Sequence, residues 1–259
     1  MRTAFSVFLL VVLVVSLTNA RIVTGGGYIG VDSTETSDPW CPAYNWIDAS
    51  SGTDYFSAYA DDGNATQPSP FAVKFFDVNY STGISFHACT NGWVSFTSNS
   101  TIYNNTTLPN SGEPYTSICL YWDDLVYRVS ETPHSHIYNY VDGSAPNRIW
   151  CIAFMDVYGM LLYTDPGSFQ VQIFEEPSGS PYNNTIEFHY LDTNFEGTSQ
   201  DSGISATVGM QDSSGTEGIL YSFTEGIVSN NLAIRFVDED RPYTNIQPVS
   251  LGNLKAIFH

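Results

Sequence analysis

The chain is built mainly of short apolar or alternating runs separated by turn residues, and this pattern limits its fold most strongly. Runs such as "FAVKFFDVNY" (71–80), "NRIWCIAFMDV" (147–157) and "SFQVQIFEE" (168–176) are rich in Phe, Val, Ile and Tyr, with Gly, Pro, Asn, Asp and Ser between runs. No window shows a capped helical repeat, so the strands must pair antiparallel. We therefore predict an all-β fold, an antiparallel two-sheet β-sandwich of jelly-roll type with about a dozen strands, and a closed barrel as the alternative.

The first 20 residues have the form of a secretory signal peptide. A basic residue, Arg2, precedes an apolar run that ends at Leu17, and small residues follow up to a predicted cleavage after Ala20. The run is shorter than the roughly 20 residues that span a bilayer, so we expect secretion without membrane insertion. The predicted parts are a signal peptide (1–20), an extended N-terminal leader (21–39), a single β-sandwich domain (40–237) and a C-terminal tail or extra strand (238–259).

The charge balance restricts the partners of the chain. Lys and Arg number 8 against 27 Asp and Glu, which gives a formal net charge of −19. A field of this sign repels nucleic acid and anionic lipid. The expected partners are other extracellular proteins, copies of the same chain, neutral glycans and cations.

Sequons and cysteines fit an extracellular protein. Asn-x-Ser/Thr sequons predict glycosylation at exposed sites, and they begin at Asn64, Asn79, Asn99, Asn104, Asn105 and Asn183. In an oxidising compartment, four cysteines predict two disulfides with three possible pairings. These are Cys41, Cys89, Cys119 and Cys151, of which the last three lie in predicted strands.

Acidic clusters raise the question of chemistry. Asp61 and Asp62 form one doublet, and Asp123 and Asp124 form another at the end of an apolar run. Carboxylates of this kind can coordinate calcium, which is the one cofactor for which the sequence offers candidate ligands, although Asp is common in turns without any ion. The alternative is that the aspartates bond backbone amides in turns. Adjacent carboxylates on a strand point to opposite sides, so the second doublet does not predict a catalytic pair.

Several runs resemble, in order, a β-sandwich module of secreted bacterial proteins. The most specific element is Thr90-Asn91-Gly92-Trp93, in "TNGWVSF", followed about thirty residues later by Trp122-Asp123-Asp124-Leu125. Modules of this type occur beside subtilisin-like proteases and in surface adhesins, and they are distantly similar to the nidogen domain. The resemblance covers roughly residues 43–237 and implies a non-catalytic extracellular module.

These observations predict a secreted, N-glycosylated structural or adhesive protein without enzymatic activity. Self-assembly by strand exchange is one expected property, with the leader or "LKAIF" (254–258) as the donated strand. A carbohydrate-binding, lectin-like module is the alternative, with Trp40, Tyr44, Trp46 and Tyr55 as candidate stacking residues. A hydrolase would need a second carboxylate that converges on Asp123 or Asp124.

Overall fold

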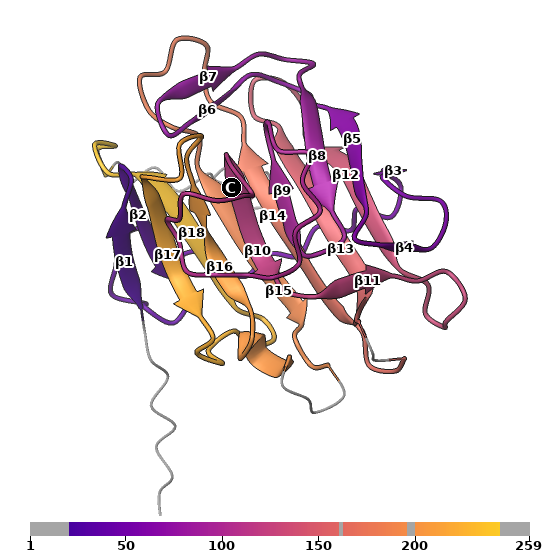
Figure 1. Ribbon diagram of the computed structural model, residues 1–259. Coiled ribbons are helices and arrows are strands. Elements are labelled where there is room, and N and C mark those ends of the chain that lie inside the picture. Colours follow the sequence, from indigo (N-terminus) through magenta and orange to yellow (C-terminus); the bar gives the residue numbers. More distant parts are fainter. Residues whose placement is uncertain (1–20, 161–162, 196–199, 244–259) are drawn as a thin grey trace, which may run out of the picture.

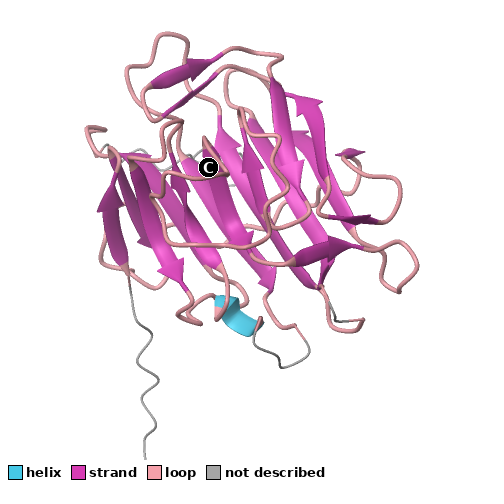
Figure 2. Cartoon of the chain, viewed as in Figure 1, coloured by secondary structure: helices cyan, strands magenta, loops and turns pink. Residues whose placement is uncertain are grey.

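The computed structural model describes residues 21–160, 163–195 and 200–243. Within them the chain forms two facing antiparallel sheets, a two-stranded hairpin and one short 3-10 turn, η1 (Asp201–Gly203) (Figures 1 and 2). The all-β sandwich predicted from the alternating runs is confirmed. No helix in the described part of the chain is long and apolar enough to cross a bilayer.

The larger sheet has ten strands. Its main path runs β1-β2-β18-β15-β14-β13-β11-β4, and β12 pairs with β13 and β3. The strands are β1 (Ile22–Gly25), β2 (Tyr28–Asp32), β3 (Thr53–Asp54), β4 (Ala60–Asp61), β11 (Leu125–Tyr127), β12 (His136–Asp142), β13 (Ile149–Gly159), β14 (Gly167–Phe174), β15 (Ile186–Asp192) and β18 (Ala233–Asp238). The register of β13 shifts between Phe154 and Val157, and past this point its partner changes from β12 to β11.

The smaller sheet has six strands in the order β17-β16-β10-β9-β8-β5. They are β5 (Asn64–Pro68), β8 (Ser85–Cys89), β9 (Trp93–Ser95), β10 (Ser117–Trp122), β16 (Thr207–Gln211) and β17 (Gly218–Phe223). The hairpin of β6 (Val73–Phe75) and β7 (Val78–Tyr80) lies over one end of the sandwich (Figure 1). The hairpin adds aromatic side chains such as Phe75 and Tyr80 to the core between the sheets.

The core follows from the alternation in the sequence. In β14, Phe169, Val171 and Ile173 point into the space between the sheets and belong to the main cluster of buried apolar side chains. The intervening Gln170 and Gln172 lie on the outer face, yet both are buried as well. A buried glutamine must find hydrogen-bond partners, so something has to cover that face.

Residues 40–50 cover the outer face of the larger sheet. Gln170 donates from Nε2 to the carbonyl of Ile47 and Gln172 donates to the carbonyl of Asn45. The backbone N–H of Asn45 donates to Nδ1 of His189, which leaves Nε2–H of His189 to donate to Glu187 at 3.0 Å. Polar side chains of the sheet thus bind the backbone of a segment that is not itself a strand.

A second loop, residues 97–116, covers the outer face of the smaller sheet. The indole nitrogens of Trp93 and Trp122 both donate to the carbonyl of Ile102, at 3.2 and 3.1 Å. Leu108 packs with the two indoles in a separate buried cluster. The loop therefore closes over two tryptophans that point away from the main core.

The predicted leader is extended but is part of the sheet. Its residues include β1 and β2, and β2 pairs with β18 because their apolar faces complete the same core. At the other side of β1, Gly25 lies so near the carbonyl of Gly218 in β17 that a Cβ would be 2.3 Å from it. The two sheets thus approach each other along this margin. Residues 1–20 and the "LKAIF" segment lie outside the described residues.

Candidate metal centre

Three carboxylates from two separate loops lie together beside the end of β10. Asp61 ends β4, Asp62 follows it, and Asp124 lies between β10 and β11. One oxygen of each lies within 4.8 Å of the others. Asp62 is exposed, whereas Asp61 and Asp124 are half-buried. The pairing of Val126 with Asp61 joins the loops, because it makes β4 the neighbour of β11.

The loop of Asp61 and Asp62 is fastened to the "TNGW" turn. Asp62 has a φ of 51°, in the left-handed region that Asp tolerates better than most residues. The next residue, Gly63, donates its N–H to Oγ1 of Thr90 at 3.0 Å, and its carbonyl accepts the N–H of Thr90 at 2.9 Å. These bonds hold the acidic loop against residues 90–93.

Asn91 connects the two halves of the motif. Its Nδ2 donates to Oδ1 of Asp62 at 2.8 Å, and its Oδ1 accepts the backbone N–H of Leu125 at 3.0 Å. Its carbonyl accepts the N–H of Asp123 at 3.3 Å, and the side chain is fully buried. Asn91 therefore positions Asp62 and the 123–125 turn relative to each other.

The Asp123–Asp124 doublet splits between two environments. The Asp123 carboxylate is 7% exposed and accepts the hydroxyl of Ser205 and the N–H of Asp124. Asp124 instead faces Asp61 and Asp62. Of the four predicted ligands, the structure brings three together. Asp123 lies apart from them, because its carboxylate accepts the hydroxyl of Ser205.

Burial and neighbouring negative charges both act on Asp124. Burial raises the pKa of Asp124 above its ordinary value, and the charges of Asp62, Asp61 and Asp123 raise it further. The pKa of Asp123 is also raised by burial, against the hydrogen bonds that it accepts. A cation among Asp61, Asp62 and Asp124 would remove this repulsion.

The donor set fits calcium. All three donors are hard carboxylate oxygens, and Ca²⁺ binds such oxygens at about 2.3–2.6 Å, so that ligands on opposite sides of the ion stand about 5 Å apart. The three carboxylate oxygens lie within 4.8 Å of one another, close enough to contact one such ion. Calcium takes about six to eight oxygens, and the exposed side of Asp62 is open to water as a further source.

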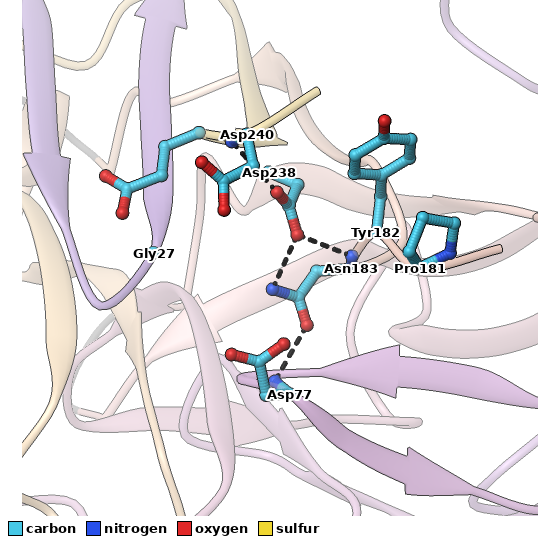
Figure 3. A pocket seen from close by; sticks show the side chains of 8 residues that line it. Gly27, Asp77, Pro181, Tyr182, Asn183, Asp238 and Asp240 are labelled. Carbon is cyan, nitrogen blue, oxygen red and sulfur yellow. Dashed lines mark hydrogen bonds between the residues drawn. The ribbon is translucent and has the colours of Figure 1, made fainter. Parts of the chain in front are cut away.

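A third acidic stretch, residues 238–240, takes part in hydrogen bonds within the protein. Asp238 accepts the N–H of Asp240 at 3.0 Å and the N–H and Nδ2 of Asn183 at 2.7 and 3.0 Å. Figure 3 shows Asn183 between the Asp238 carboxylate and the backbone of Asp77, whose N–H it accepts at 2.8 Å. These bonds tie the β6–β7 hairpin to the end of β18.

The structure separates the six sequons into two groups. The sequon residues Asn79, Asn99 and Asn104 are exposed. In the other three, Nδ2, the atom that carries an N-linked glycan, donates within the fold: Asn64 to Ser100, Asn105 to Ser205 and Asn183 to Asp238. Two of the exposed sequons lie on the 97–116 loop.

We expect glycans on the exposed group and not on Asn183, whose side chain is 2% exposed. Replacing Ser81 with Ala removes the Asn79 sequon and should lower the mass of the secreted protein by one glycan. The Thr185→Ala variant removes the Asn183 sequon but keeps the asparagine, and it should leave the glycan mass unchanged. Mass spectrometry before and after glycosidase treatment measures both; a glycopeptide that contains Asn183 would contradict the assignment.

The four cysteines are free in the structure, contrary to the predicted disulfides. Cys89 and Cys119 are both paired with Trp93, from opposite sides of β9. Two strand spacings separate their backbones by roughly 9–10 Å, beyond the reach of a disulfide. Burial raises the pKa of each of these thiols to about 12, which keeps them protonated at neutral pH.

The other two cysteines are also far apart. Cys151 lies on the outer face of the larger sheet, opposite Gln172, and three strand spacings separate it from Arg235 at the far side of that face. Nη1 of Arg235 donates to the carbonyl of Trp40, the residue before Cys41, which places Cys41 near Arg235. A bond between the two would have to cross about 14 Å of sheet.

The candidate stacking aromatics lie in or near the segment over the larger sheet. Tyr44 packs edge-on against His189, and Trp40 packs edge-on against Tyr243. Trp46 is half-buried, and Tyr55 is 8% exposed, in the main core. The first two thus contact other side chains of the protein.

Comparison with known proteins identifies the family. The profile described as NIDO related, a nidogen-related domain, matches residues 39–246. Neither a search of curated proteins nor a search of solved structures gave a significant match. Domains of this kind are typical of extracellular proteins and are generally non-catalytic. The match spans most of the chain and nearly all of the sandwich, and the protein therefore belongs to the nidogen-related domain family.

Proposed function

We propose that the protein is a secreted, glycosylated structural or adhesive module without catalytic activity, and that calcium at Asp61, Asp62 and Asp124 fixes the loops at one end of its sandwich. The observation that carries the proposal is the convergence of three carboxylates within 4.8 Å from two loops. The family supports an extracellular setting, where calcium is abundant.

The calcium site rests on the cost that the trio imposes when it is empty. Burial and the charges of Asp62 and Asp61 raise the pKa of Asp124, so its charged form destabilises the folded state. Asn91 holds the Asp62 loop beside the 123–125 turn, so the loops are not free to separate. Binding of a cation would turn this repulsion into attraction, and any ligand that binds only the folded state stabilises it.

We expect calcium to raise the melting temperature. At a free concentration about 100 times the dissociation constant, the gain is about 2.7 kcal/mol, or roughly 5–10 °C for a domain of this size. Differential scanning calorimetry in calcium and in chelator measures the shift. The Asp124→Asn variant should lose it, whereas Asp142→Asn, an exposed carboxylate elsewhere, should keep it.

The pH dependence supplies an independent check. Because the folded-state pKa of Asp124 is raised, the folded protein binds this proton more readily than the unfolded chain. In chelator, the destabilisation by Asp124 is fully present near neutral pH and shrinks as the pH falls through that pKa toward the ordinary value of 3.8. The stability difference between wild type and Asp124→Asn should therefore narrow in mild acid. Equal melting in calcium and chelator would refute the metal site.

For self-association, we propose that a strand from another copy adds at β5. Among residues 21–160, 163–195 and 200–243, this strand ends the smaller sheet and has a hydrogen-bonded neighbour on one side only. The opposite margin is less open, because Gly25 in β1 already lies against Gly218 in β17. Edge strands with free backbone groups accept further strands.

Removing residues 244–259 tests whether the C-terminal segment donates the strand. We expect the shortened chain to keep its melting temperature, since Arg241 and its bonds to Glu176 and Asn183 are retained. Light scattering should show fewer or smaller assemblies than for the full mature chain. The same mass distribution for both chains would exclude the C-terminal segment as the donor.

A further inference from the structure

Asp32, at the end of β2, is a buried acid without an ionic partner in the described residues. It is 1% exposed, and none of the ion pairs found there includes it. Its Oδ1 accepts the N–H and the hydroxyl of Thr34, at 2.9 and 2.6 Å. Its Oδ2 accepts the hydroxyl of Tyr221 at 2.9 Å and the backbone nitrogen of Arg21 at 3.1 Å. A buried carboxylate that meets only neutral donors is expensive to maintain.

Tyr221 shows the effect of that charge. Its pKa is raised first by burial and then by the negative charge of Asp32 and by the hydrogen bond to it. The guanidinium of Arg21 lies over the Tyr221 ring, 5.5 Å from its centroid, and is bound to both carboxylate oxygens of Glu225. The charge of Arg21 is thus matched by Glu225, and Asp32 keeps an unmatched charge.

The backbone of Arg21 is held at Asp32 from both sides. The adjacent pair of the β1–β2 ladder is Ile22 with Val31. One step further, the N–H of Asp32 donates to the carbonyl of Arg21 at 3.3 Å, while the nitrogen of Arg21 donates to the Asp32 carboxylate. Together with the anchored guanidinium, this fixes the main-chain nitrogen of residue 21 against a buried anion.

The sequence places a cleavage site at this same nitrogen. The signal-peptide pattern ends at Ala20, so the bond to be hydrolysed joins Ala20 to Arg21. Water adds across that bond: Ala20 leaves with a carboxylate, and the nitrogen of Arg21 becomes an α-amino group that takes up a proton. A neutral amide with one donor is thereby replaced by a cation with three.

We propose that Asp32 is the binding site for the cleaved amino terminus: removal of residues 1–20 creates an α-ammonium group on Arg21 that forms a buried ion pair with Asp32 and completes the sandwich. Cleavage thus adds a counter-charge to a carboxylate that is 1% exposed and meets only neutral donors in the described residues. The proposal does not depend on the calcium site, which involves other loops.

The test uses the full chain, secreted by a eukaryotic host, and a variant with one Gly inserted between Ala20 and Arg21. Mass spectrometry of the N-terminal peptide should give Arg21 as the first residue of the former and the inserted Gly as that of the latter. The insertion leaves Arg21 with an amide nitrogen and displaces the ammonium by roughly 3.5 Å. We expect the variant to melt about 5 °C or more below the native product at pH 7.

The Asp32→Asn variant and the pH dependence of the melting temperature distinguish an ion pair between the Arg21 ammonium and Asp32 from an ordinary hydrogen bond. In the Asp32→Asn background, the insertion should no longer change the melting temperature. Pairing raises the pKa of an α-amino group above its unfolded value of about 7.7–8.0, so the effect should be complete below that range and vanish as the pH rises through the folded-state value. If Asp32→Asn fails to fold, the melting temperatures of the insertion variant and the native product at pH 7 and at about pH 10 still test for the ion pair.

Three results would overturn the proposal. The first is a mature protein that begins at a residue other than Arg21. The second is equal melting of the native and inserted termini at pH 7. The third is a difference that persists at high pH or in the Asp32→Asn background, since the effect would then come from chain length and not from charge.

Discussion

Replacing Gly92 with alanine is expected to cost at least about 4 kcal/mol, a loss that marks a specific steric conflict. Gly92 has a φ of 77°, and a Cβ there would lie 2.0 Å from the carbonyl oxygen of Tyr121. That backbone cannot move aside freely, because the N–H groups of Leu120 and Tyr121 both donate to the carbonyl of Gly92. The melting temperature should fall by roughly 8–16 °C in a thermal scan.

Gly83→Ala is a matched control for this prediction. Gly83 has a φ of 82°, nearly the same as Gly92, but a Cβ at this position would meet nothing within 4 Å. The control variant therefore bears only the cost of the left-handed backbone, about 1–2 kcal/mol. Similar losses for both variants would mean that the contact with Tyr121 contributes nothing beyond backbone strain.

Replacing Glu187 with alanine is the second change with a large expected effect. Its carboxylate is 3% exposed and accepts Nε2–H of His189 at 3.0 Å and Nε–H of Arg235 at 2.6 Å. Removing it leaves a buried donor and an unmatched cation beneath the 40–50 segment, which costs about 3–5 kcal/mol. Because that segment is held through His189, we also expect faster proteolysis within residues 40–50, read by mass spectrometry of the fragments.

The pH dependence of the same site follows from the pKa of Glu187. Burial alone would raise it, but the hydrogen bond from His189 and the charge of Arg235 prevail and hold it below the ordinary value of 4.5. The stability that the ionised Glu187 contributes is therefore fully present above about pH 4.5 and is lost as the pH falls through the folded-state pKa. A Glu187→Gln variant should show a weaker loss of stability in that acid range.

Glu225→Ala is a control for the Glu187→Ala variant. It breaks an exposed ion pair and should cost at most about 1 kcal/mol. A loss of stability as large as that of Glu187→Ala would count against a special role of the buried network.

The fold was largely predictable because its signals are local. Alternation in "SFQVQIF" places Phe169, Val171 and Ile173 on one face, and they are in the core. Alternation also predicts an outer polar face, but it does not reveal that Gln170 and Gln172 are buried by residues 40–50, because that contact spans more than 120 positions of sequence. For the same reason the strands β1 and β2 within the predicted leader were missed.

The sequence predicts which residue types form the candidate site, but only partly which of these residues come together in the fold. Acidic doublets identified Asp61, Asp62 and Asp124 as possible calcium ligands, and the structure brings them together. The separation of Asp123 from the trio depends on Ser205, some eighty residues away, and no local pattern indicates this bond. Asn91 belongs to the Thr90–Trp93 motif, and the spacing of that motif before the Trp122–Leu125 run was the available signal for its bridging role.

The position of Trp93 between Cys89 and Cys119 also bears on how the protein is made. In the finished sheet, β9 separates the two thiols and the 97–116 loop closes over them. In the nascent chain β9 does not yet separate them, and in an oxidising compartment any two thiols that meet can be joined. Such a bridge would draw β8 and β10 together and exclude β9. If the domain folds in such a compartment, β9 must pair with β8 and β10 before the two thiols are oxidised.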